Sequence, residues 1–135
     1  MAQHRKRPRK RRNPNLPDGY KGHISCSCHS LEEVKSRKKQ CDYVFLSPVF
    51  DSISKQNYKS SYSDVELKNA HKAGIIDKRV IALGGIDINN IKEVKNHGFG
   101  GAAVLGALWN KFDLCDTHDF SDLIEHFKKL KKLAD

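Results

Sequence analysis

The sequence predicts an α/β fold of four parallel βα units, which corresponds to the second half of a TIM (β/α)8 barrel. Three short, almost wholly apolar runs indicate strands that are covered on both faces of a parallel sheet. Two of the runs end in glycine turns, where bare backbone N–H groups can approach a phosphate, as the last two βα loops of such barrels often do. The runs are Tyr43-Val-Phe-Leu-Ser-Pro-Val49, Val80-Ile-Ala-Leu-Gly-Gly-Ile86 and Gly101-Ala-Ala-Val-Leu-Gly-Ala107.

Two capping boxes mark the expected starts of helices in the first half of the domain. In each, a serine precedes a helix and a glutamate follows three residues later, as in Ser30-Leu-Glu-Glu33 and Ser63-Asp-Val-Glu66. The elements expected around them are a strand over 23–29, a helix over 30–38, a strand over 43–47, a loop over 48–62 and a helix over 63–74 that Gly74 closes.

In the second half, Asp87 is expected to be the N-cap of a helix. The alternation of strands and helices requires parallel strands with right-handed crossovers. The expected elements are a strand over 80–83, a helix over 87–96 that Gly98 ends, a strand over 102–105, a connector around Trp109 and an amphipathic helix over 120–133.

The positive charge gathers at one end of the chain. The net charge is +9, and residues 1–12 contain seven of the 25 Lys and Arg residues and no acidic residue. We therefore expect residues 1–19 to form a basic arm and linker, and residues 20–135 to form the folded domain. The arm could bind nucleic acid or an acidic lipid through phosphate contacts, or be a solvated tail.

The chain has no run of 18 apolar residues and no apolar segment after the arm, so neither a transmembrane helix nor a secretory signal is predicted. We expect no membrane partner. The sequence contains no Cys-x-x-Cys pair. Its four cysteines are interpreted as core thiols in a reducing cytoplasm: Cys26, Cys28, Cys41 and Cys115. A zinc site from Cys26, Cys28 and His29 is disfavoured, because a strand would point His29 to the opposite face.

Polar and glycine residues gather where the expected strands end, and parallel α/β folds bind their ligands at that edge. Ser52, Ser54 and Lys55 offer two hydroxyl groups and an ammonium in one loop. Each feature alone is also typical of an exposed loop or a tight turn, but together they predict a cradle for a phosphate. The glycines after the third and fourth strands are Gly84, Gly85 and Gly106.

Four motifs resemble the thiamine phosphate synthase family, which includes the related thiazole tautomerases. The resemblance covers about residues 23–110 at consistent spacing. Two family threonines are replaced by serines that keep the hydroxyl group, and Ser25 and Ser47 stand where glycine is usual. The motifs are Ser27-Cys-His29, Asp42-Tyr-Val-Phe-Leu-Ser-Pro-Val-Phe-Asp-Ser-Ile-Ser-Lys55, Ala82-Leu-Gly-Gly-Ile86 and Ala103-Val-Leu-Gly-Ala107.

The resemblance implies an enzyme that joins hydroxymethylpyrimidine diphosphate to a thiazole phosphate and releases pyrophosphate. By it, Ser27 contacts the pyrimidine and Lys55 the diphosphate. In a tautomerase, His29 would instead move a proton on the thiazole, or it could simply orient the helix cap. The residues implied to hold the thiazole phosphate are Ser52, Ser54, Gly84, Gly85, Leu105 and Gly106.

The resemblance also implies components that this sequence lacks. The first four βα units of the family supply a glutamine-arginine-lysine segment and the aspartates that hold Mg²⁺, so magnesium is expected of the family but without ligands here. A half-barrel has two open sheet edges, and we expect either a homo-oligomer or a separate N-terminal half to complete it. A tautomerase, a non-catalytic phosphate-ligand binder, a truncated remnant and a nucleic-acid-associated protein remain alternatives.

Overall fold

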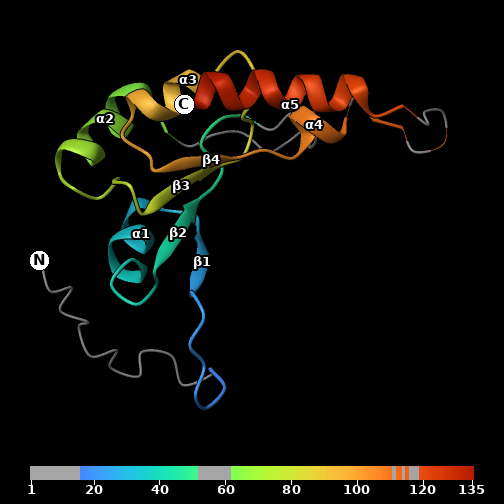
Figure 1. The fold of residues 1–135 in the computed structure, drawn as a ribbon. Coiled ribbons are helices and arrows are strands. Elements are labelled where there is room, and N and C mark those ends of the chain that lie inside the picture. The colour runs from blue at the N-terminus through green and yellow to red at the C-terminus, as the bar shows by residue number, and fades with distance from the viewer. Residues whose placement is uncertain (1–15, 52–61, 111, 114, 116–118) are drawn as a thin grey trace, which may run out of the picture.

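A computed structural model describes residues 16–51, 62–110, 112–113, 115 and 119–135 (Figure 1). Their four strands are all parallel and lie in the order β1-β2-β3-β4, which confirms the predicted fold of parallel βα units. The elements are β1 (Ser25–Cys28), α1 (Leu31–Arg37), β2 (Tyr43–Leu46), α2 (Asp64–Lys72), β3 (Val80–Leu83), α3 (Ile91–Asn96), β4 (Gly101–Ala103), α4 (Gly106–Trp109) and α5 (Ser121–Ala134).

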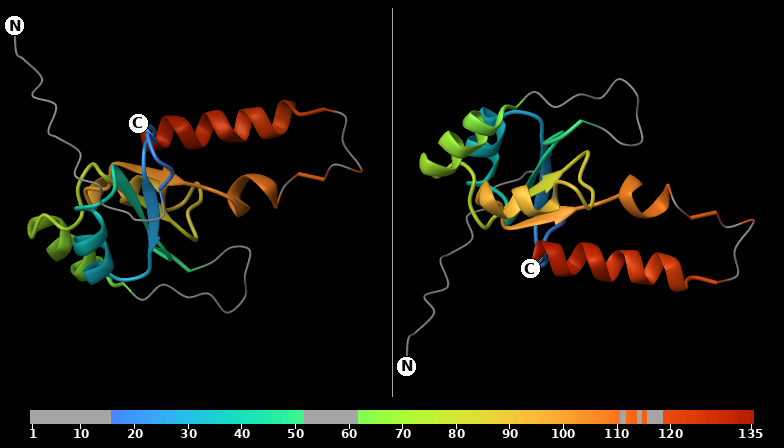
Figure 2. Two further views of the ribbon diagram at one scale, coloured as in Figure 1. Left: turned by 90° about the horizontal axis from the view of Figure 1, so that it is seen from below. Right: turned by 90° about the horizontal axis from the view of Figure 1, so that it is seen from above.

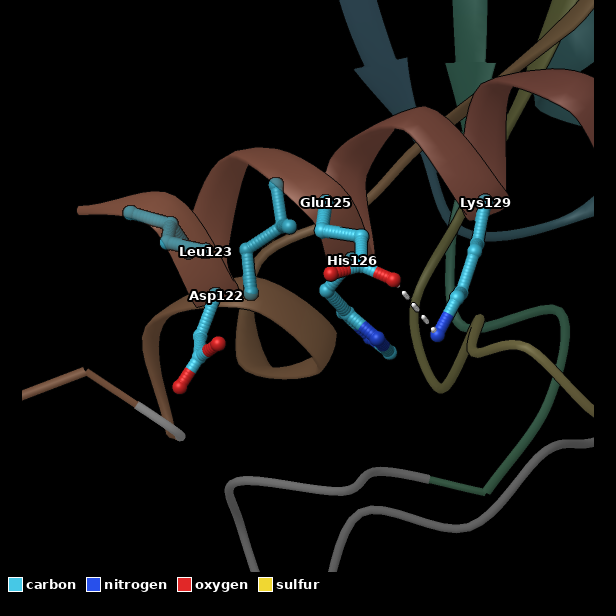
Figure 3. A pocket seen from close by; sticks show the side chains of 6 residues that line it. Asp122, Leu123, Glu125, His126 and Lys129 are labelled. Carbon is cyan, nitrogen blue, oxygen red and sulfur yellow. Dashed lines mark ion pairs between the residues drawn. The ribbon is translucent and has the colours of Figure 1, made fainter.

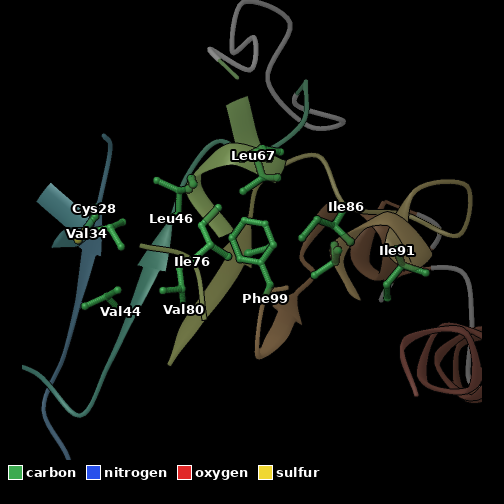
Figure 4. Close-up of a cluster of buried hydrophobic side chains, with 14 of the residues drawn as sticks. Cys28, Val34, Val44, Leu46, Leu67, Ile76, Val80, Ile86, Ile91 and Phe99 are labelled. Carbon is green, nitrogen blue, oxygen red and sulfur yellow. The ribbon is translucent and has the colours of Figure 1, made fainter. Parts of the chain in front are cut away.

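One face of the sheet is the core of the domain (Figure 4). Val44 and Leu46 of β2 and Val80 of β3 are fully buried there against side chains from the helices, such as Val34 and Leu67. These apolar side chains alternate along short strands, which explains why the strands appear as continuous apolar runs in the sequence.

The other face, which we call the open face, is only partly covered. Ser27, Phe45, Ile81 and Gly101 lie in one register row across it, and Ser27 is exposed whereas the other three are half-buried. Tyr43 packs edge-on against Phe45, with ring centroids 5.6 Å apart. A parallel sheet normally has both faces covered, so this face is available for further packing.

Both predicted capping boxes begin helices. Ser63 accepts the Glu66 N–H at 3.2 Å while its own N–H donates to the Glu66 carboxylate at 2.7 Å. At α1, Ser30 accepts the Glu33 N–H at 3.1 Å, but the Glu33 carboxylate bonds to the N–H of His29 instead of Ser30. The sequence thus predicted both helix starts correctly, and one of the two reciprocal bonds is displaced by one residue.

The helix expected from Asp87 begins later, at Ile91, with Asn90 as its N-cap. The Asp87 carboxylate accepts the N–H of Asn89 at 2.8 Å, and the Asp87 N–H donates to the Asn90 side chain at 2.9 Å. Asp87 therefore stabilises the turn before the helix, so its expected role as the helix N-cap was wrong.

The final helix, α5, contacts α3 and α4 (Figure 2). Leu130 is 2% exposed, whereas Phe120, Ile124 and Phe127 are about half exposed, so only the last turns of the predicted apolar stripe are covered. Among the described residues, we find no helix that is both long and apolar enough to cross a membrane.

Candidate functional site

The β2–α2 loop lies directly against the glycine turn that follows β3. The N–H of Val49 donates to the carbonyl of Leu83 at 3.0 Å, and that of Phe50 to the carbonyl of Gly84 at 3.1 Å. Gly85 has a φ of +65°, and a Cβ at this position would stand 2.0 Å from the carbonyl oxygen of Asp51. The close approach of the two loops therefore requires glycine.

Gly84 is equally constrained. Its φ is +98°, and a Cβ there would lie 2.9 Å from Cα of Pro48 and 3.4 Å from Oγ of Ser47. The Ser47 side chain thus occupies space beside the glycine turn, at a position where glycine was expected. Asn90, which the sequence analysis did not single out, fixes the turn by donating from Nδ2 to the Gly85 carbonyl at 2.8 Å.

The predicted hydroxyl and ammonium groups belong to the same loop. Ser52, Ser54 and Lys55 lie outside the residues that the structure describes. The described part of the loop ends at Asp51, whose carbonyl oxygen would meet a side chain at Gly85.

A short helix follows the last strand. Leu105 is its N-cap and is 62% exposed, and α4 starts at the buried Gly106. Because β3 and β4 are parallel neighbours, this turn opens at the same sheet edge as Gly84 and Gly85. The loops after the last strands of TIM barrels, together with the start of a short extra helix, are where such barrels frequently bind phosphate.

His29 connects the ends of β1 and β2. Its Nδ1 lies 3.0 Å from the carbonyl oxygen of Ser47. A carbonyl only accepts, so Nδ1 carries the proton of the neutral ring and Nε2 is the proton acceptor. The backbone of His29 also holds the helix cap, because its N–H donates to the Glu33 carboxylate at 2.7 Å. Both roles considered for His29 are compatible with this geometry.

Tyr62 was not predicted as a site residue, yet its hydroxyl donates to the His29 carbonyl at 3.0 Å. Burial raises the pKa of Tyr62, and the carboxylates of Glu32 and Glu33 raise it further. Tyr62 therefore keeps its proton for this bond at neutral pH. It stands at the end of a polar loop, where nothing in the local sequence distinguishes it.

Ser27 lies on the open face of β1, two residues before His29. The structure thus places Ser27, His29, the Gly84–Gly85 turn and the Leu105–Gly106 turn at or near the carboxyl edge of one sheet. In the described parts of the chain, no group of three or more His, Cys, Asp or Glu side chains is arranged so that it could hold a metal ion.

The described surface also has a pocket between α4 and the first half of α5 (Figure 3). None of the predicted site residues lines it. Its walls combine apolar and charged groups, and Lys129 forms an ion pair with Glu125 at 3.3 Å. The lining residues are Leu108, Asp122, Leu123, Glu125, His126 and Lys129.

The cysteines differ in exposure: Cys28 is buried, Cys26 and Cys41 are partly buried, and Cys115 is exposed. The interpretation of all four as core thiols was therefore wrong for Cys115.

Comparisons with known proteins agree with the motifs. The chain is similar to thiamine phosphate pyrophosphorylase from Bacteroides thetaiotaomicron, with 56% identity, a TM-score of 0.79, and coverage of 93% of this chain and 59% of that chain. The corresponding protein from Pyrococcus furiosus shows 26% identity and a TM-score of 0.59 over 82% of this chain and 48% of that chain. These neighbours identify the four βα units as part of a TIM-barrel-like fold.

A curated relative is the thiamine-phosphate synthase of Actinobacillus succinogenes, which is 30% identical over 73% of this chain and 45% of its own length. The chain spans about half the length of the curated relatives it matches. The family model for thiamine monophosphate synthase matches residues 16–108. The chain therefore belongs to the thiamine monophosphate synthase family.

Proposed function

We propose that this chain acts in thiamine biosynthesis and provides the thiazole-phosphate-binding half of a thiamine phosphate synthase site. The observation that carries the proposal is the contact between the β2–α2 loop and the glycine turn after β3. Two backbone hydrogen bonds join them, and neither Gly84 nor Gly85 has room for a side chain. The start of the β2–α2 loop, just before the Ser-x-Ser-Lys motif in the sequence, is thereby anchored at the carboxyl edge of the sheet.

The proposed phosphate site combines hydroxyl groups with backbone N–H groups. Ser52 and Ser54 supply the hydroxyls, and the Gly84–Gly85 and Leu105–Gly106 turns supply the N–H groups. A phosphate is well matched to such groups, because its oxygens accept hydrogen bonds from hydroxyl and backbone N–H donors and the glycine turns add little bulk. The site would hold the thiazole with its ring toward the open face of the sheet.

The proposed reaction couples this thiazole phosphate to hydroxymethylpyrimidine diphosphate. Pyrophosphate leaves, and the thiazole nitrogen forms a bond to the pyrimidine methylene carbon. Catalysis then consists of positioning the two substrates and neutralising the departing pyrophosphate. Lys55 would neutralise the diphosphate, and Ser27 would contact the pyrimidine from β1.

A thiazole tautomerase is the second candidate, and the ring of His29 favours it. Because Nδ1 donates to the Ser47 carbonyl, Nε2 can accept a proton from a bound thiazole and return it. The two candidates share the phosphate site and differ in whether a pyrimidine diphosphate is required.

Magnesium is part of the proposal for a complete synthase, but the described residues do not fit it by themselves. They contain no group of three or more His, Cys, Asp or Glu side chains that could hold a metal ion. At the carboxyl edge, the Asp87 carboxylate already accepts the Asn89 N–H. We derive no step of the reaction from a metal bound to this chain.

We also propose that four further βα units complete the barrel, from a second copy or from a separate N-terminal half. The open face and the outer edges of β1 and β4 are the surfaces that such units would cover. The glutamine-arginine-lysine segment expected of the family would come from those units and would complete the diphosphate site to which Lys55 contributes.

Calorimetric titration of the full chain with thiazole phosphate tests the proposal. We expect binding that the double substitution Ser52→Ala/Ser54→Ala removes, because the phosphate loses two hydroxyl donors. Gly85→Ala should also weaken binding, because its new Cβ would displace Asp51. Gly74→Ala is the matched control: its φ is +75° and no atom lies within 4 Å of the new Cβ, so it tests backbone strain alone.

Deleting residues 1–12 should leave thiazole-phosphate binding intact and abolish any affinity for polyanions such as nucleic acid. Binding without turnover, when the pyrimidine diphosphate and an N-terminal half of the family are both added, would favour the non-catalytic phosphate-ligand binder. No binding by the folded chain would contradict the thiazole-phosphate assignment and favour a truncated remnant.

A further inference from the structure

Three cysteine thiols meet on the core side of β1, away from the candidate site. The Sγ atoms of Cys26 and Cys41 are 3.5 Å apart, and those of Cys26 and Cys28 are 3.9 Å apart. Cys26 and Cys28 belong to β1, whereas Cys41 lies in the α1–β2 loop. All three thiols are free. This cluster has no role in the proposed reaction.

The loop that contains Cys41 is held firmly in place. Arg79 donates from Nη2 to the Cys41 carbonyl at 2.6 Å and from Nε to the Asp42 carbonyl at 3.1 Å. Asp42 in turn bonds to Ile24, with its N–H donating to the Ile24 carbonyl and its carboxylate accepting the Ile24 N–H, both at 2.8 Å. These bonds fix the backbone on both sides of the thiol pair, so the short distance between Cys26 and Cys41 is built into the fold.

Geometry selects one of the two close pairs. Cys26 and Cys28 are two residues apart on one strand, where each residue advances the chain by about 3.3 Å, so their Cβ atoms are held roughly 6–7 Å apart. A disulfide needs Cβ atoms about 4 Å apart. Cys41 approaches from a different segment, and its Sγ is nearer to Cys26 than that of Cys28 is.

We propose that Cys26 and Cys41 are a redox-active dithiol that small-molecule disulfides oxidise to an intramolecular disulfide. The Cys26 thiolate attacks one sulfur of oxidised glutathione and releases one glutathione thiolate. Cys41 then loses its proton, and its sulfur attacks the Cys26 sulfur of the mixed disulfide, forming the Cys26–Cys41 bond and releasing the second glutathione. The two electrons lost by the protein reduce one glutathione disulfide to two thiols, which take up the two protons.

Burial raises the pKa of Cys41 to about 11 and that of Cys28 to about 12, and the neighbouring Cys26 thiol adds to both effects. Both residues are therefore thiols at neutral pH. Partly buried Cys26 is the more suitable first nucleophile, because Cys28 is fully buried.

The pair lies near the amino ends of β1 and β2, at the edge opposite His29 and the glycine turns. Residues at that edge of a parallel barrel contribute to stability, whereas those at the carboxyl edge contribute to chemistry. Oxidation should therefore stabilise the domain without blocking the candidate phosphate site.

The experiment is a thiol count on the full chain with Cys115→Ser, which removes the exposed cysteine. The sequence has four cysteines, so three thiols remain in this background. After equilibration with oxidised glutathione and denaturation, we expect one thiol per chain and a peptide map that links Cys26 to Cys41. The oxidised chain should also unfold at a higher urea concentration than the reduced chain.

Two variants separate the alternatives. Cys28→Ser should keep the cross-link. Cys41→Ser should stop at the mixed disulfide on Cys26, because the remaining thiol, Cys28, lies on the same strand with its Cβ too far from that of Cys26 for a disulfide. Three remaining thiols, a persistent mixed disulfide in the chain that retains Cys41, or a link between Cys26 and Cys28 would each overturn the proposal. None of these readouts depends on thiamine chemistry, so the proposed function can fail independently.

Discussion

At the scale of single residues, Arg79 bonds to three backbone carbonyls of one loop. It stands just before β3, and its guanidinium donates to the carbonyls of Lys38, Cys41 and Asp42 at 2.5, 2.6 and 3.1 Å. A guanidinium can serve several acceptors at once because its five N–H donors are fixed in a planar fork. Arg79 thus closes the α1–β2 loop, because it donates to partly buried backbone carbonyls that would otherwise lack these hydrogen bonds.

Replacing this side chain tests its role. Arg79→Met should lower the free energy of unfolding by about 2 kcal/mol or more, since partly buried carbonyls lose charged donors. Urea titration followed by circular dichroism measures the loss. Arg37→Met removes an arginine that is exposed on α1 and serves as the control. Equal losses for the two variants would contradict the loop-closing role.

At the scale of elements, Lys38 and Asp77 join the end of α1 to the loop between α2 and β3. The Lys38 ammonium is 2.8 Å from the Gly74 and Ile75 carbonyls and from the Asp77 carboxylate. Burial opposes the charged form of Asp77, but the hydrogen bonds from Lys38 and from the Arg79 N–H outweigh it and lower the pKa of Asp77. One ion pair therefore positions two neighbouring βα units.

A lowered folded-state pKa stabilises the fold above the pKa of the unfolded chain, roughly 4 for an aspartate. That stabilisation is lost as the pH falls through the folded pKa. Asp77→Asn should therefore reduce stability at pH 7 and flatten the loss of stability below about pH 4, while its Oδ1 can still accept the Arg79 N–H. Urea unfolding between pH 2 and 7 measures the slope. Asp122→Asn, which removes a carboxylate at an exposed position of α5, is the control.

At the scale of the whole molecule, the open face and the exposed apolar side chains of α4 and α5 indicate a fold that needs further packing. Trp109, Phe120 and Phe127 are each about half exposed. Phe112 links two of them, with ring centroids 5.9 Å from Trp109 and 5.3 Å from Phe120. Exposed aromatic clusters of this kind are typical of association surfaces.

We therefore expect the isolated 15.3 kDa chain to associate in solution. Light scattering after gel filtration should give a mass of a dimer or larger, and an added N-terminal half of the family should compete with self-association. Phe45→Ser, on the open face, should weaken association more than Val65→Ser, which replaces an apolar side chain that is 64% exposed on α2. A folded, soluble monomer would contradict the proposal that a second copy completes the barrel.

The sequence predicted the fold well because its signals are local. Apolar runs, serine caps and glycine turns each act within a few residues, and the strands and the two capped helix starts followed them. The prediction that Asp87 is a helix N-cap was wrong because an aspartate stabilises a turn as readily as it caps a helix. Tyr62 and Arg79 could not be found in this way, because their partners are backbone groups brought near only by the folded sheet. The contact of Asn90 with Gly85 is local, but the sequence pattern favoured Asp87 for the cap of this helix.

The candidate site was predicted only in part. The glycine turn was predicted for its N–H groups, whereas the structure shows in addition that Gly84 and Gly85 make room for the preceding loop. That steric role depends on the backbone of Pro48 and Asp51, which belongs to another βα unit. The roles of Ser52, Ser54 and Lys55 stay predictions.

The order of the strands has a consequence for how the chain acquires its fold. Each strand pairs only with those next to it in the sequence, so every strand contact closes a single βα crossover. Such contacts cost less loop entropy than pairing between strands far apart in the sequence would. Each βα unit can therefore add to a sheet edge that the preceding unit has formed, in the order in which the chain is synthesised.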